Sequence, residues 1–172
     1  ELTFQGRNAV LEAFRSGKTI DKLFILDGCQ DGPIKSIVRE AKKTDAIINY
    51  VDKERLDRLA GTGHHQGVVA IGAAYEYAEV DDILAAAKEK GEDPFIFILD
   101  EIEDPHNLGA IIRTANLAGA HGVIIPKRRA VGLTATVAKT SAGAINYTPV
   151  AKVTNISQTI EELKKQGLWF VC

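Results

Sequence analysis

The stretch FIFILDEIEDPHNLGAIIRTANLAGAHGVIIP, residues 95–126, decides the fold class. It opens with a continuous apolar run at 95–100, continues as a helical segment at 108–119 and ends with a second apolar run at 122–126. Continuous apolar runs are typical of strands that are covered on both faces, as in a parallel sheet. Because a strand, a helix and a second strand follow one another, we expect an α/β domain with a parallel sheet.

The alternation of strands and helices continues on both sides of this stretch. After it, we expect a strand at 148–153, a helix at 156–167 and a strand at 168–172. Before it, the expected elements alternate up to about residue 75: helices at 6–17, 34–43 and 52–61, and strands at 21–26, 46–51 and 67–75. We therefore predict three parts, which are a small N-terminal α/β domain at 1–75, a linker with one short helix at 76–94, and a parallel-sheet domain at 95–172.

The composition is that of an ordinary globular protein. Of the 172 residues, 45% are hydrophobic and 26% are charged, and no apolar run approaches the roughly 18 residues of a membrane span. We find no signal peptide pattern at the start, and the two cysteines, Cys29 and Cys172, form no disulfide framework. We therefore expect a cytoplasmic protein without a membrane partner. The formal net charge is −2, so RNA binding would have to depend on a local basic patch.

Open α/β sheets bind their ligands at the carboxyl ends of the strands. The expected strands bring the loops 100–108 and 126–133, together with the chain end after Cys172, to one such edge. Asn107 and Gly109 lie where the first loop enters the helix. Taken singly, Asn107 is a helix N-cap and Gly109 is a packing glycine, whereas their position in the loop indicates the entrance of a ligand site.

Arg113 lies in the middle of the apolar helix, beside Ile111 and Ile112. We expect its side chain to be buried, and a buried arginine has to pair with a carboxylate or reach a polar pocket. Two interpretations follow. The guanidinium forms a structural salt bridge to Asp100 or Asp104, or it is held at a site that binds an anion or a hydroxyl group.

A basic cluster, Lys127, Arg128 and Arg129, follows the second apolar run, and Lys139 lies on the next helical segment. Such a cluster is usually a solvated turn, but at the carboxyl end of a strand it suits contacts with RNA phosphates. The small residues of TSAGA (140–144) either let a ligand approach the backbone closely or only pack a helix end.

Two motifs resemble those of the SpoU (TrmH) family of RNA 2′-O-ribose methyltransferases. The segment NLGAIIRTA (107–115) is similar to the first motif, and IIPKRRAVGLTATVAKTSAGA (124–144) is similar to the second. GRNAVLEAFRSG (6–17) and HHQGVVA (64–70) resemble the small substrate-binding domain of one branch of this family. That branch methylates a guanosine ribose in large-subunit ribosomal RNA, and the resemblance covers nearly the whole chain.

The resemblance implies an S-adenosylmethionine-dependent enzyme that methylates a ribose 2′-hydroxyl in structured RNA, with ribosomal RNA as the first candidate and tRNA as the second. It also implies a C-terminal SPOUT domain with a trefoil knot, a ribosomal-protein-like RNA-binding domain at the N-terminus, and a homodimer. Carried over by position, it implies that Asn107 and Arg113 belong to the catalytic site and that Ser141 and Gly143 contact the cofactor.

The family carries a third motif, C-terminal to the second, that supplies most of the cofactor pocket and threads the knot. The residues up to GLWFVC (167–172) do not contain it, so we expect a C-terminally truncated methyltransferase domain with an incomplete knot. A non-catalytic RNA-binding module therefore stays open as an alternative. A dinucleotide-binding enzyme is disfavoured, because no GxGxxG follows the run at 95–100. We expect no metal, since acidic turns such as 100–104 are common and the family needs none.

Overall fold

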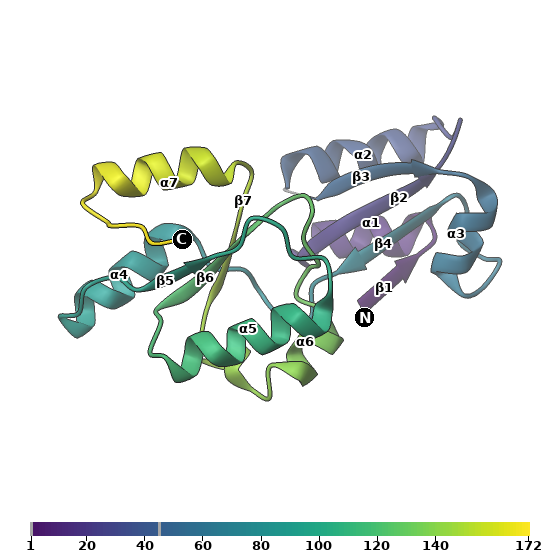
Figure 1. Cartoon of the computed structure of the whole chain (residues 1–172). Coiled ribbons are helices and arrows are strands. Elements are labelled where there is room, and N and C mark those ends of the chain that lie inside the picture. The colour runs from purple at the N-terminus through teal and green to yellow at the C-terminus, as the bar shows by residue number, and fades with distance from the viewer. Residues whose placement is uncertain (1, 45) are drawn as a thin grey trace. The chain divides into compact units, whose positions relative to one another are not determined.

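The computed structural model describes residues 2–44 and 46–172, and the chain forms two compact units, Glu1–Ala74 and Tyr75–Cys172 (Figure 1). Each unit combines a β-sheet with helices, which confirms the predicted α/β class. In the described part of the chain, no helix has the length and apolar character that crossing a membrane requires.

The first unit contains a mixed sheet with the strand order β1-β4-β2-β3. Its elements are β1 (Leu2–Gln5), α1 (Arg7–Arg15), β2 (Ile20–Leu26), α2 (Gly32–Lys43), β3 (Ile47–Val51), α3 (Lys53–Ala60) and β4 (Val68–Gly72). Strand β3 runs parallel to β2, whereas β4 is antiparallel to both β2 and β1. Strand β1 is an addition to the elements predicted from the sequence.

Helices cover both faces of this sheet. Because successive strand residues point to opposite faces, Leu23 and Ile25 of β2 pack with α1 and α2, while Phe24 packs with Leu56 of α3. Asp31 caps α2, because its carboxylate accepts a hydrogen bond from the Ile34 backbone N at 3.1 Å.

The second unit contains a parallel sheet with the strand order β5-β6-β7, which confirms the predicted parallel sheet. Its elements are α4 (Val80–Lys90), β5 (Ile96–Ile98), α5 (Pro105–Leu117), β6 (Gly122–Pro126), α6 (Ala135–Thr140), a short 3-10 helix η1 (Ala144–Asn146), β7 (Val150–Val153) and α7 (Ile156–Lys165).

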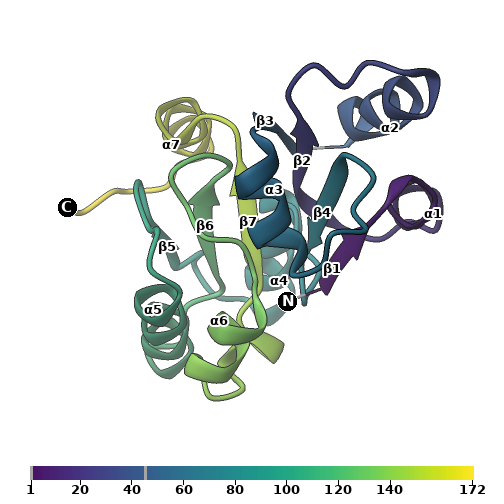
Figure 2. The same cartoon turned by 90° about the vertical axis from the view of Figure 1, so that its right-hand side faces the viewer.

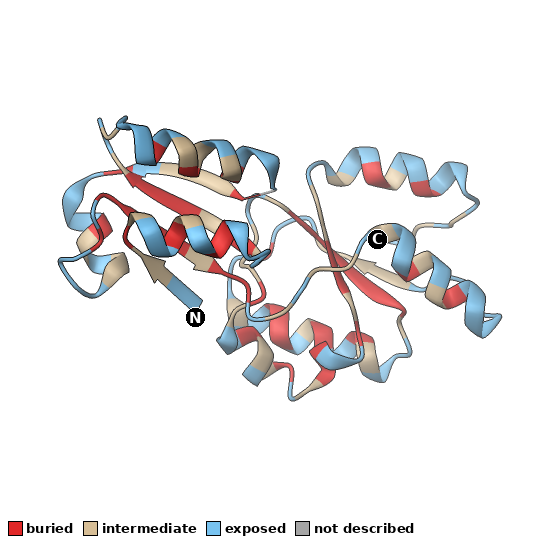
Figure 3. Ribbon diagram, turned by 180° about the vertical axis from the view of Figure 1, so that it is seen from behind, coloured by how far each residue is buried: buried red, intermediate tan, exposed pale blue. Residues whose placement is uncertain are grey.

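Strand β6 is buried along its whole length, as its apolar run predicts (Figure 3). Val123 and Ile125 pack with α5 and α6 on one face, and Ile124 packs with Ile83 of α4 and Leu163 of α7 on the other. Figure 2 shows α5 and α6 on one side of this sheet and α7 on the opposite side. The sheet is therefore a covered middle layer, and its strand ends are left for a site.

The predicted strand at 168–172 is wrong. Among the described residues, no strand pairs with this segment. Leu168 and Phe170 pack with the α4–α7 cluster, whereas Trp169 and Val171 are each 97% exposed. The apolar run LWFVC resembles a strand, but a strand also needs a neighbour that satisfies its backbone groups.

The segment predicted as a linker, 76–94, lies within the second unit. Ala78 forms a parallel bridge to Ala151 of β7, and the Ala78 backbone N donates to the Val150 carbonyl oxygen at 2.9 Å. Helix α4 buries Ile83 completely against the sheet. This segment is therefore a layer of the second unit.

Candidate functional site

The loops that follow β5 and β6 meet at the carboxyl edge of the parallel sheet. Ile102 forms a parallel bridge with Ala130. The Ile102 backbone N donates to the Arg129 carbonyl oxygen at 2.9 Å, and the Val131 backbone N donates to the Ile102 carbonyl oxygen at 2.7 Å. The two loops that the sequence places at one edge are thus joined by backbone hydrogen bonds.

Helix α5 begins at this edge, and its N-cap is Asp104 rather than Asn107. The Asp104 carboxylate accepts hydrogen bonds from the backbone N of His106 at 2.7 Å and of Asn107 at 3.1 Å. Pro105 follows as the first helical residue, a position where its missing N–H is not needed. The prediction that Asn107 caps the helix is therefore wrong. Its exposed side chain lies in the first turn and is left available for a ligand.

Arg113 is exposed, so the predicted burial of its side chain is wrong. Successive helical residues are about 100° apart, and the buried face of α5 is made by Leu108, Ile112 and Ala115. Arg113 instead belongs to an exposed stripe, the outer stripe of α5, which consists of His106, Ala110, Arg113 and Leu117. Among the residues that the structure describes, neither Asp100 nor Asp104 forms a salt bridge with Arg113. The guanidinium is therefore open to a ligand.

Gly109 brings the two motif segments into direct contact. A Cβ atom at Gly109 would lie 1.8 Å from Thr140 Oγ1, 2.7 Å from Thr140 Cβ and 3.0 Å from the Ser141 backbone N. Thr140 Oγ1 in turn donates toward the Thr136 carbonyl oxygen at 2.9 Å. Only a glycine allows α5 and α6 to approach this closely, so the packing role predicted for Gly109 is confirmed.

The end of α6 is a sharp backbone turn. The Ser141 side chain is buried, and its hydroxyl donates to the Ala138 carbonyl oxygen at 2.9 Å. Ala142 and Gly143 follow with φ values of 51° and 85°, both in the left-handed region. No atom lies within 4 Å of a Cβ built on Gly143. The turn therefore presents backbone next to open space, whereas the Ser141 hydroxyl serves the helix end.

The predicted basic residues lie in the second unit, on the loop after β6 and on α6. Arg128, Arg129 and Lys139 are exposed, and Lys127 is half-buried. The Lys127 backbone N donates to the Val153 carbonyl oxygen at 2.7 Å, which ties the start of this loop to β7. Arg129 adopts a φ of 59°, a conformation that directs the chain back toward Ile102.

Tyr77 supports this loop and was missed by the sequence reasoning. Its hydroxyl accepts a hydrogen bond from the Leu133 backbone N at 3.0 Å, and Lys152 Nζ lies 4.3 Å from the centre of its ring. The alternation of Tyr75, Glu76 and Tyr77 is a strand-like signal, but a local signal does not indicate which strand the segment lies beside. In residues 2–44 and 46–172, no three His, Cys, Asp or Glu side chains gather as a metal site would require.

Comparison with known proteins gives two matches that divide the chain between them. Residues 5–78 match the family model described as RNA 2′-O ribose methyltransferase substrate binding, and residues 94–172 match the SpoU rRNA Methylase family. A Bacillus subtilis relative, YacO, whose name assigns it to the TrmH family of tRNA/rRNA methyltransferases, is 55% identical over 96% of this chain and 66% of its own length. A relative of the same description from Staphylococcus haemolyticus is 49% identical over 98% of this chain and 68% of its own.

The fold, the contact between the two motif segments and these matches define the class. The chain belongs to the SpoU (TrmH) family of RNA methyltransferases. It spans about two thirds of the length of the curated relatives it matches. The structure of the SpoU methyltransferase AviRb from Streptomyces viridochromogenes, in complex with the cofactor AdoMet, is 20% identical and aligns over 96% of this chain and 58% of its own, with a TM-score of 0.46.

Proposed function

We propose that this chain takes part in S-adenosylmethionine-dependent methylation of a ribose 2′-hydroxyl in structured RNA. The proposed target is a guanosine of large-subunit ribosomal RNA, with tRNA as the second candidate. The observation that carries the proposal is the contact of Gly109 with Thr140 and Ser141, because it holds the two motif segments of the family against each other.

Arg113 is the proposed catalytic residue. A methyl transfer is a displacement that depends mainly on the positioning of donor and acceptor. Because an arginine guanidinium stays protonated in proteins, it is suited to donate hydrogen bonds rather than to accept a proton. Arg113 therefore orients the ribose hydroxyl and stabilises the negative charge that develops on its oxygen while the hydroxyl proton passes to water. Asn107, in the first turn of the same helix, keeps the site in shape.

Ser141 and Gly143 are proposed to lie at the cofactor. The open space beside Gly143 fits a ligand that approaches the backbone, and the buried Ser141 hydroxyl holds the turn that presents it. S-adenosylmethionine supplies the electrophilic methyl group. The role of Ser141 is thus to position the backbone rather than to contact the reacting atoms.

The exposed cations of the second unit are proposed to hold RNA phosphates. Arg128, Arg129 and Lys139 have the exposure that this role needs, and Lys127 lies at the base of the same loop. The N-terminal domain predicted at 1–75 is proposed to bind the RNA substrate, with 95–172 as the methyltransferase domain. We propose in addition that the protein works as a homodimer in the cytoplasm, in line with its family.

The test is methyl transfer from labelled S-adenosylmethionine to ribosomal RNA by the wild-type chain and two variants. Since Arg113 is exposed and forms no ion pair within the described residues, Arg113→Ala should leave the fold intact and lower the rate about 100- to 1,000-fold. Arg113→Lys should stay well below the wild type, because an ammonium lacks the planar fork of the guanidinium.

Lys165→Ala, an exposed change on α7, is the matched control and should keep full activity. Full activity of Arg113→Ala would contradict the role proposed for Arg113. RNA binding without any binding of S-adenosylhomocysteine in calorimetry would favour a non-catalytic RNA-binding module instead.

A further inference from the structure

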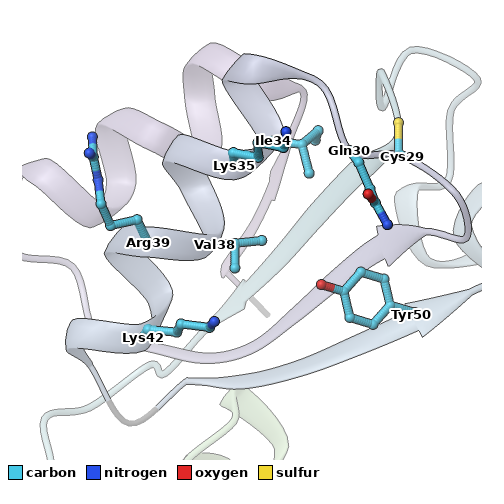
Figure 4. A pocket seen from close by; sticks show the side chains of 8 residues that line it. All are labelled: Cys29, Gln30, Ile34, Lys35, Val38, Arg39, Lys42 and Tyr50. Atoms are coloured by element: carbon cyan, nitrogen blue, oxygen red, sulfur yellow. The ribbon is translucent and has the colours of Figure 1, made fainter.

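A hollow of about 450 Å³ lies between α2 and β3 in the first unit, away from every residue assigned above. This volume is within the range of small-ligand sites. Figure 4 shows the side chains that line it: Cys29, Gln30, Ile34, Lys35, Val38, Arg39, Lys42 and Tyr50. We call it the α2–β3 pocket.

One side of the α2–β3 pocket is strongly basic. Lys35, Arg39 and Lys42 are spaced at i, i+4 and i+7 along α2, so they form one stripe about 10 Å long. All three are exposed, and among the described residues none of them forms a salt bridge. Their neighbour Lys43, by contrast, is 2.9 Å from the Glu40 carboxylate. The stripe therefore keeps its positive charge available to an anionic partner.

The opposite side carries an aromatic ring. Tyr50 lies on β3, the edge strand, and its side chain is on the same face as Ile48, which packs with α1 and α2. The core ends at Ile48, and Tyr50 is 56% exposed beyond it. The pocket thus has a ring that is more than half exposed on one side and a row of cations on the other.

The floor between these two sides is apolar. Ile34 is buried, and Val38 is partly buried against the core of the first unit. In Figure 4, Gln30 and Lys42 are directed toward Tyr50, whereas Arg39 extends along the outer side of α2. A planar ligand can thus stack on the Tyr50 ring with its edge toward the Gln30 amide. Anionic groups on either side of that ligand can then contact the basic stripe.

We propose that the α2–β3 pocket binds an unpaired nucleotide of the RNA substrate. Its base stacks on Tyr50 and hydrogen-bonds to Gln30, and its flanking phosphates contact Lys35, Arg39 and Lys42. Stacking of a base on an aromatic side chain beside a basic groove is typical of single-stranded RNA recognition. An acidic peptide would use the cations but not the ring. The inference rests on the proposed function only in taking RNA as the partner.

The experiment measures the affinity of the whole chain for a fluorescent RNA hairpin with an unpaired loop, and for the blunt duplex of its stem, by anisotropy. Tyr50→Ala should weaken hairpin binding about 10- to 100-fold, because one stacked base is lost. Tyr50→Phe keeps the ring and should bind within about twofold of the wild type. The duplex should bind more weakly than the hairpin, with no response to Tyr50→Ala.

The cations are tested by salt dependence. Changing Lys35, Arg39 and Lys42 together to Gln should lower the slope of log affinity against log salt by about 2, since each single-strand phosphate contact contributes about 0.7. The matched control changes Lys18, Arg55 and Arg58, which are exposed cations of the same unit, to Gln and should change the slope by less than half as much.

The outcomes separate this inference from the proposed function. If the wild-type chain binds no RNA, the proposed function fails along with the inference. If it binds the hairpin but Tyr50→Ala or the pocket triple variant behaves like the control, only the α2–β3 pocket is overturned. Equal binding of hairpin and duplex, or displacement of the hairpin by polyglutamate at the same concentration as by unlabelled RNA, would also overturn it.

Discussion

A single residue, Gly109, determines how closely α5 and α6 approach each other. A methyl group at this position would overlap Thr140 Oγ1, so Gly109→Ala forces the helices apart or Thr140 out of its rotamer. We expect a loss of about 1–3 kcal/mol in the free energy of unfolding, measured by urea denaturation with circular dichroism.

Gly32→Ala is the control for this prediction. Gly32 opens α2 with no atom within 4 Å of the added Cβ and without a positive φ, so the change should be neutral or stabilise by up to about 1 kcal/mol. An unchanged denaturation midpoint for Gly109→Ala would show that the helices are not held at this distance.

Asp57 makes the stability of the first unit dependent on pH. Hydrogen bonds from Lys53 Nζ, at 2.7 Å, and from His65 Nε2, at 2.7 Å, hold the pKa of the Asp57 carboxyl below its usual value of 3.8. His65 Nδ1 accepts from the Gly67 backbone N at 3.0 Å, so Nε2 carries the hydrogen that Asp57 receives. The ionised carboxylate therefore stabilises the fold.

Because the folded-state pKa is lowered, this stabilisation is fully present above about pH 4 and is lost as the pH falls through the folded pKa. Asp57→Asn should thus lower the melting temperature at pH 7, and the difference from the wild type should shrink below pH 4. Lys53→Met removes the hydrogen bond that contributes most to the lowered pKa of Asp57. This variant should therefore show part of the same pH-dependent loss of melting temperature. A difference that stays constant from pH 7 to pH 3 would contradict this origin.

The sequence identifies the motif residues of the candidate site, but it does not predict how exposed their side chains are. The close packing at Gly109 could be predicted because its residue type and position indicate it, whereas the contact of the basic loop with phosphates stays a prediction. The burial of Arg113 was predicted wrongly, because the apolar content of α5 was averaged over the helix, while a side chain's exposure depends on its angle around the axis. The cap lies at Asp104 because an aspartate followed by a proline is a stronger helix start than Asn107 three residues later.

At the level of elements, Ile83 of α4 tests whether the segment before β5 is part of the second unit. Its side chain is fully buried and packs tightly against β6. A Cβ atom built on Gly122 of β6 would lie only 2.5–2.9 Å from Ile83 side-chain atoms. Ile83→Ala should cost about 2–5 kcal/mol of unfolding free energy in urea denaturation. Glu89→Ala, on the exposed side of α4, should stay within about 0.5 kcal/mol. A flexible linker would respond to neither change.

Most helices and strands could be predicted because their period and end signals are local. The parallel direction of β5, β6 and β7 follows from the βαβ pattern. What failed depends on neighbours in space. The segment 168–172 is an apolar run like that of a strand but lacks a pairing partner within the described residues, and Tyr77 acquires its role from β7 and Leu133. Pairing between distant segments is not encoded in a local pattern.

At the scale of the whole molecule, two units with separate cores divide the proposed work. The first unit contains the α2–β3 pocket, which we propose to bind an unpaired base, and the second holds the two methyltransferase motif segments in contact. The net charge of −2 is compatible with RNA binding because cations cluster locally, with Lys35, Arg39, Lys42 and Lys43 on α2 and Lys127, Arg128 and Arg129 on the loop after β6.

The most direct test of the central claim is nucleoside analysis by liquid chromatography and mass spectrometry. Ribosomal RNA lacking the modification is incubated with the chain and S-adenosylmethionine and digested to nucleosides. We predict that 2′-O-methylguanosine appears with the wild-type chain and is lost with Arg113→Ala. A methyl group on a base, or an equal yield of the ribose-methylated nucleoside from Arg113→Ala, would contradict ribose methylation by a site that contains Arg113.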